Sequence, residues 1–128
     1  MLRLTPDLLT NVELIDSQHQ ELVAAMNKLR VQRPDEIGES LDFLISYVER
    51  HFKDEEDLMS AHGYPVLELH QNQHKLFSNK MSNYKTIFKE SSDPERIQKE
   101  IISFLDTWLV SHIKNSDMGF AKYYYSKS

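Results

Sequence analysis

Apolar residues recur at steps of three and four along most of this chain, which is the period of an amphipathic helix. The pattern predicts helices at about residues 16–30, 35–60, 66–89 and 94–114. Each predicted helix carries one apolar stripe, and stripes of this kind are buried against other helices. The predicted inner positions are Leu22, Val23, Met26, Leu29, Ile37, Leu41, Leu44, Ile45, Val48, Phe52, Leu67, Phe77, Met81, Tyr84, Phe88, Ile97, Ile101, Leu105, Trp108, Leu109 and Ile113.

Three short breaks separate the predicted helices. They read "VQRPDE", "AHGYP" and "SSDP", and the proline in each suits the first turn of the helix that follows. Asp16 or Ser17 is expected to cap the first helix, and Asp93 the fourth. Because short connections join antiparallel neighbours, we expect an all-α, up-down-up-down four-helix bundle. Residues 1–15 would form an N-terminal arm, the last residues a short C-terminal tail, and residues 1–128 one domain.

Composition removes several classes of function. The net charge of −5 argues against binding to nucleic acid or to an anionic membrane surface, because phosphate groups require a basic patch. The chain has no cysteine, which excludes disulfides, thiolate zinc sites and iron–sulfur clusters. No stretch approaches the roughly 20 apolar residues of a membrane span, and the first residues lack the apolar run of a signal peptide. We therefore expect a cytoplasmic protein.

The histidines carry the strongest chemical signal. A single histidine on an apolar face is usually a hydrogen-bonded core residue, but burying several around one core is costly unless their nitrogens are satisfied. Neutral imidazole is a good ligand for iron, copper or zinc, so a metal centre inside the bundle is the better interpretation. His62 lies in the "AHGYP" break and is expected to be exposed and unligated. The five histidines that extend the apolar stripes are His19, His51, His70, His74 and His112.

The spacing within the helices adds carboxylates to this set. His70 and His74 are four residues apart, as are His51 and Glu55, so each pair shares one helix face. Asp117 lies five residues beyond His112, which on a regular helix is about 140° away from it. It reaches the core only if the helix loosens into a π-type turn or ends at "KNSD". The acids around Glu55 project from the outer faces and are interpreted as solvated surface charge: Asp54, Glu56 and Asp57.

Five histidines and two carboxylates exceed the capacity of one ion. They suit two six-coordinate ions if both carboxylates bridge the pair and a single solvent atom forms a third bridge. This arrangement leaves one coordination position open, where a small ligand can bind.

The segments "ELIDSQHQEL", "HFKDEEDLM", "YPVLELHQNQH" and "WLVSHIKNSD" together resemble the hemerythrin family, and in particular its prokaryotic single-domain members. The resemblance covers roughly residues 12–120 and implies a non-haem di-iron site with an oxo or hydroxo bridge. It implies that one iron is held by three histidines and the other by two, with the open position on the second iron. All seven ligand positions of the family motif have matching residues here, which are His70, His74 and His112 for the first iron, His19 and His51 for the second, and Glu55 and Asp117 as bridges.

The resemblance also implies a function. By position, the walls around the open iron are Leu22, Trp108, Leu109 and Ile113, and this apolar pocket offers no acid or base for catalysis. Reversible dioxygen binding, for storage, delivery or scavenging, is therefore favoured over enzymatic activity. Two alternatives remain open. One is an oxygen or redox sensor that acts through a separate partner chain, and the other is a reductase of peroxide or nitric oxide.

Overall fold

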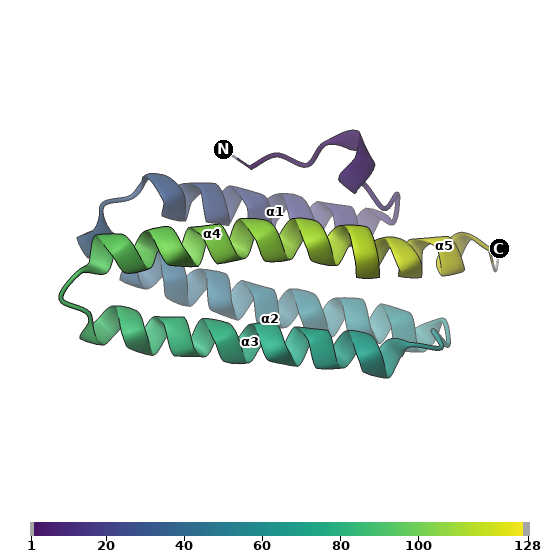
Figure 1. Cartoon of the computed structure of the whole chain (residues 1–128). Coiled ribbons are helices and arrows are strands. Elements are labelled where there is room, and N and C mark those ends of the chain that lie inside the picture. Colours follow the sequence, from purple (N-terminus) through teal and green to yellow (C-terminus); the bar gives the residue numbers. More distant parts are fainter. Residues whose placement is uncertain (1, 127–128) are drawn as a thin grey trace.

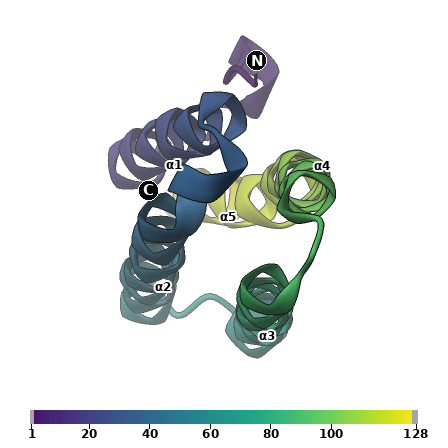
Figure 2. The same cartoon turned by 90° about the vertical axis from the view of Figure 1, so that its left-hand side faces the viewer.

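Four long antiparallel helices make up the body of the protein. The computed structural model describes residues 2–126, so Met1 of the predicted arm and Lys127 and Ser128 of the predicted tail lie outside the described residues. The four helices are α1 (Glu13–Val31), α2 (Ile37–Ala61), α3 (Leu67–Glu90) and α4 (Pro94–His112). They run alternately up and down side by side (Figure 1), and in end view they occupy the corners of a square (Figure 2). Residues 2–126 contain no strand, and the predicted all-α four-helix bundle is confirmed.

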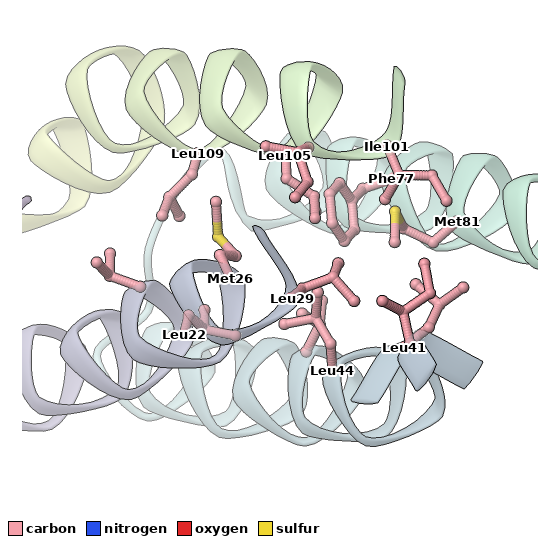
Figure 3. Packing of buried hydrophobic residues seen from close by; sticks show 14 of the residues in the cluster. Leu22, Met26, Leu29, Leu41, Leu44, Phe77, Met81, Ile101, Leu105 and Leu109 are labelled. Carbon is pink, nitrogen blue, oxygen red and sulfur yellow. The ribbon is translucent and has the colours of Figure 1, made fainter. Parts of the chain in front are cut away.

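The apolar stripes of the helices meet along the bundle axis and form the core. Side chains from all four helices interdigitate there (Figure 3), and Leu29, Ile37 and Ile101 are completely buried. Burying one such side chain contributes roughly 1.5–3 kcal/mol. None of the helices in residues 2–126 combines the length and the apolar composition needed to cross a membrane.

The first helix begins earlier than its pattern predicts. It begins at Glu13, and the predicted cap at Asp16 or Ser17 is wrong. The carboxylate of Asp16 instead accepts hydrogen bonds from the backbone N–H and the hydroxyl of Thr10 (2.8 and 2.7 Å) and from the N–H of Asn11 (2.8 Å). Asn11 has a φ of 63°, a left-handed conformation that is unfavourable for most L-residues. Asp16 therefore holds the bend that leads the arm into α1.

Helical structure continues through "KNSD". A π-helical segment, η3 (Ile113–Asp117), follows α4, and a further helix, α5 (Met118–Ser126), continues from it along nearly the same line (Figure 1). α4 thus ends close to the predicted residue 114, and most of the predicted C-terminal tail is helical. The physical reason is a second apolar cluster at this end of the bundle, in which Phe120 and Ala121 are buried with Val12, Ile15 and Met59.

Candidate metal centre

Five histidines and two carboxylates converge inside the bundle near the end where η3 begins. One histidine comes from α1, one from α2, two from α3 and one from the end of α4, and each is at most 6% exposed. The two carboxylates, Glu55 of α2 and Asp117 of η3, are completely buried. Two overlapping groups of side chains place their ligand atoms within 4.8 Å of one another, namely Glu55 with His70, His74 and His112, and Glu55 with His19 and His51.

Three histidines form one half of this centre. The Nε2 atoms of His70 and His74 each lie 3.2 Å from Nε2 of His112. Oε1 of Glu55 lies 2.6, 3.3 and 3.9 Å from Nε2 of His70, His74 and His112. Oδ1 of Asp117 lies 3.1 Å from Nε2 of His70 and 3.2 Å from Nε2 of His112. Two nitrogens bound at right angles to one ion, at bond lengths of about 2.1 Å, lie about 3 Å apart, so the spacing suits one cation.

Two histidines form the other half. Oε2 of Glu55 lies 3.4 Å from Nε2 of His51 and 3.9 Å from Nε2 of His19. Oδ2 of Asp117 lies 3.1 Å from Nε2 of His19. Each carboxylate therefore presents one oxygen to the three-histidine half and the other oxygen to the two-histidine half. That arrangement would let both carboxylates bridge two ions.

The π-helical segment brings Asp117 into this position. On a regular helix Asp117 would face about 140° away from His112. The π-type turn of Ile113–Asp117 accommodates an extra residue, and Asp117 consequently lies over the same interior as His112. Isolated π-turns of this kind occur frequently at functional sites.

Several buried polar atoms in the centre make no hydrogen bond. All of them except Nδ1 of His19 lie 3.1–3.9 Å from an imidazole nitrogen or a carboxylate oxygen of the centre. A buried polar atom without a partner is costly, and imidazole nitrogens and carboxylate oxygens are good ligands for transition metals. The donor set thus fits a pair of cations. The unpartnered atoms are Nδ1 and Nε2 of His19, Oε2 of Glu55, and Oδ1 and Oδ2 of Asp117.

Electrostatics support the same interpretation. Burial raises the pKa of Glu55 and of Asp117, but the surrounding histidines outweigh burial and hold both pKa values below their usual range. Burial lowers the pKa of His112, yet Asp117 and Glu55 raise it to about 9. Burial lowers the pKa of His51 to about 4, which keeps that imidazole neutral. Two ionised carboxylates in a dry core require positive charge beside them, which either protons on histidines or metal ions can supply.

The outer nitrogens of two histidines are held by side chains that the periodicity did not single out. Nδ1 of His51 lies 2.7 Å from Oε1 of Gln18, and Nδ1 of His74 lies 2.7 Å from Oε2 of Glu56. When each of these oxygens accepts a hydrogen bond from Nδ1–H, the proton stays on Nδ1 and the Nε2 lone pair can bind a metal. The interpretation of Glu56 as solvated surface charge is therefore wrong, since its carboxylate is only 23% exposed and contacts a histidine of the centre.

Asp54 and Asp57, the other two acids beside Glu55, differ in their exposure and contacts. Asp54 is half-buried and accepts a hydrogen bond of 2.8 Å from Nε2 of Gln18. Asp57 is exposed and pairs with Lys53 at 2.9 Å. The prediction of solvated surface charge therefore fits Asp57, but it did not foresee the contact between Asp54 and Gln18.

Aromatic rings fix the planes of two histidines. The ring of Phe52 stacks on His74 with centroids 3.8 Å apart and an interplanar angle of 4°. The indole of Trp108 stacks on His112 with centroids 4.4 Å apart and an angle of 12°. These contacts restrict rotation of the imidazoles and shield the three-histidine half from water.

A narrow apolar cavity borders the centre. His19 and His51 of the two-histidine half and His112 form one wall, and the free volume is about 10 Å³, close to the minimum that holds one water-sized molecule. Three of the predicted wall residues, Leu22, Trp108 and Leu109, line it, and Figure 3 shows Met26 between Leu22 of α1 and Leu109 of α4. Ile113 is completely buried but does not line this cavity. The wall residues that the sequence prediction missed are Met26, Leu44, Val48, Phe52, Phe77 and Leu105.

His62 belongs to neither of the two groups of side chains that could hold a metal ion. It follows α2 and is half-buried. Its ring lies 4.9 Å from that of Tyr124 and 6.4 Å from that of Phe120. The expectation that this side chain is exposed is therefore wrong, because α5 covers it.

This chain is similar, in both sequence and structure, to proteins of one family. The family model described as "Hemerythrin HHE cation binding domain" matches residues 10–124. A bacteriohemerythrin of Pseudomonas aeruginosa is 35% identical over 118 residues, which are 89% of this chain and 75% of that protein. A bacteriohemerythrin of Stenotrophomonas maltophilia is 31% identical over 119 residues, covering 90% of this chain and 76% of that protein. A crystal structure of wild-type hemerythrin superimposes with a TM-score of 0.76 at 31% identity, covering 88% of each chain.

Proposed function

This chain belongs to the hemerythrin family, and from that membership we propose that it binds dioxygen reversibly at a pair of non-haem iron ions. His70, His74 and His112 would hold one iron, His19 and His51 the other, and Glu55 and Asp117 would bridge them. Two ferrous ions held there would supply the two electrons needed for reversible binding of dioxygen.

The composition of the cavity supports binding rather than catalysis. It touches both histidines of the two-histidine half, where one coordination position would remain open. Apart from its histidines, the wall consists of apolar and aromatic side chains, and none of these carries a carboxylate, an amine or a hydroxyl. An apolar diatomic molecule suits such a space, and no general acid or base stands ready to convert it. This lining is the observation that carries the proposal.

The chain's own residues would protect the bound ligand. Leu22, Leu109 and Trp108 line the cavity, and its free volume of about 10 Å³ leaves no room for a large ligand. Apart from its histidines, the lining offers water and small anions no hydrogen bond, so they would be disfavoured at the open position. Burial of the bridging carboxylates also fixes the charge of the centre, because changing the charge of a dry site is costly.

Cycles of gas exchange test this function. The iron-loaded, reduced protein should develop a visible absorption band in air, lose it under argon, and regain it over several cycles. Rapid conversion to a ferric spectrum with steady consumption of hydrogen peroxide or nitric oxide would instead favour the reductase. A spectrum that cycles only when a second protein is bound would favour the sensor.

A further inference from the structure

Two consecutive glutamates face opposite nitrogens of one imidazole. Oε1 of Glu55 lies 3.3 Å from Nε2 of His74, and Oε2 of Glu56 lies 2.7 Å from Nδ1 of the same ring. Phe52 stacks on that ring and fixes its plane. His74 is thus held on three sides, and its outer partner is a carboxylate whose surroundings exclude most solvent.

The two-histidine half has weaker support on its outer side. Nδ1 of His51 meets Oε1 of Gln18, which belongs to a neutral amide. The nearest carboxylate on this path is that of Asp54, which accepts a hydrogen bond from the other end of the same amide. Nδ1 of His19 is buried and makes no hydrogen bond within residues 2–126. The carboxylate of Asp54 is therefore separated from His51 by the side chain of Gln18, whereas the carboxylate of Glu56 contacts His74 directly.

We propose that Glu56 is a positioning residue that makes the three-histidine half the tighter and more electron-rich of two cation sites. A carboxylate that accepts a hydrogen bond from Nδ1–H gives the imidazole partial anionic character and increases its basicity at Nε2. A neutral amide orients the ring of His51 equally well but increases its basicity less. The two sites consequently differ in affinity and fill in a fixed order. This inference rests on the proposed two-metal centre.

Stepwise binding of Co²⁺ to the metal-free protein provides the first readout. The wild-type chain should bind two Co²⁺ ions in two resolvable steps. Glu56→Gln should weaken the tighter step by about 10–100-fold, the usual effect of losing a partner of this kind, and leave the weaker step unchanged. In the iron-loaded protein the same substitution should make the reduction potential more positive, because the ligand becomes less electron-rich.

Two further variants separate this role from a general effect of charge or folding. Asp57→Asn removes the same charge from the next residue, which is exposed and pairs only with Lys53 among the contacts described, and it should change neither step. The double substitution Gln18→Glu with Asp54→Asn exchanges amide and carboxylate while keeping their hydrogen bond. It should tighten the weaker step and shift the reduction potential in the negative direction.

The outcomes discriminate between this inference and the proposed function. Binding of a single Co²⁺ ion by the wild-type chain would overturn the two-metal centre and the inference together. If Glu56→Gln still binds two Co²⁺ ions with both affinities unchanged, and its reduction potential is also unchanged, only the role of Glu56 would be overturned. The role of Glu56 would also be overturned if Glu56→Gln weakened both Co²⁺ binding steps equally, or if Asp57→Asn weakened the tighter step as much as Glu56→Gln does. The inference would be supported if Glu56→Gln is folded, as judged by circular dichroism, and only its tighter Co²⁺ binding step is weakened.

Discussion

The carboxylates of Glu55 and Asp117 divide their oxygens between the same two groups of histidines. Oε1 of Glu55 and Oδ1 of Asp117 lie 2.6 and 3.1 Å from Nε2 of His70. Their other oxygens lie 3.9 and 3.1 Å from Nε2 of His19. One carboxylate comes from the last third of α2 and the other from a π-turn. Their matched placement therefore depends on the fold as a whole, and it is the arrangement that two bridging ligands need.

Replacing Glu55 by glutamine should remove iron. An uncharged amide bridges two cations poorly, and the remaining carboxylate cannot neutralise a pair of divalent ions alone. Elemental analysis should show clearly fewer iron atoms per chain than in the wild-type protein and in the Asp57→Asn control. A Glu55→Gln protein that keeps its full iron content and binds oxygen normally would show that Glu55 is not a bridge.

Leu109→Ala should keep both irons and shorten the life of the oxygenated form. The side chain lines the cavity, so its truncation enlarges that space and admits water and small anions. The cost in stability should be about 2–5 kcal/mol, as for other buried leucines. The decay of the visible band after exposure to air measures the rate of autoxidation.

Leu29→Ala is the matched control for that substitution. Leu29 is completely buried but does not border the cavity. Leu29→Ala should lower the free energy of unfolding by a similar amount without changing the decay rate of the oxygenated form. Equal decay rates in wild type and Leu109→Ala would contradict the role given to the cavity wall.

His62→Ala should destabilise the protein without affecting the metal. The ring packs against Phe120 and Tyr124, and such aromatic pairs contribute about 0.5–1.5 kcal/mol each. Urea denaturation should show a loss of about 1 kcal/mol, and His62→Phe should lose less because it retains a ring. Iron content should equal that of the wild type in both variants, and loss of iron in either would mean that the ligand set is misassigned.

The metal-free protein should lose stability as the solution becomes alkaline. A histidine in an unfolded chain has a pKa of about 6.5, whereas the pKa of His112 in the fold is about 9. Proton binding by His112 therefore stabilises the fold fully below pH of about 6.5, and this contribution disappears as the pH rises through about 9. The expected loss is on the order of 3 kcal/mol at most.

Urea denaturation at pH 6.5 and pH 9 measures this effect. The iron-loaded protein should show little of it, because a metal ion then takes the place of the proton beside Asp117 and Glu55. A metal-free protein with equal stability at both pH values would contradict the view that a proton on His112 compensates the buried carboxylates.

Periodicity was enough to predict the bundle and the residues that meet inside it. A histidine that continues an apolar stripe has the same direction as the stripe, so His51 and His70 could be placed in the core from spacing alone. Asp117 required a departure from regular helix geometry, and the sequence allowed either a π-turn or a helix end. The structure has the π-turn, and Phe120 of the following helix is buried with Val12, Ile15 and Met59 at the same end of the bundle.

The contacts of Glu56 and Gln18 could not be read from periodicity. A residue next to an inward-facing one lies about 100° around the helix, and whether that direction meets solvent or a neighbouring helix depends on packing. For Glu56 it meets His74 of α3, and for Gln18 it meets His51 of α2. The same limit explains His62, whose covering helix α5 follows a polar segment that resembled a terminus.

Measuring the ratio of bound oxygen to iron tests the central proposal most directly. Iron-loaded, reduced protein would be exposed to a known amount of dioxygen, and gas uptake, gas release and iron content would be measured on the same sample. Reversible binding at a two-metal centre predicts about two irons per chain by the two ligand sets, one dioxygen taken up per pair of irons, and its full recovery under vacuum. Uptake that cannot be recovered as dioxygen, or one tightly held cation per chain, would contradict it.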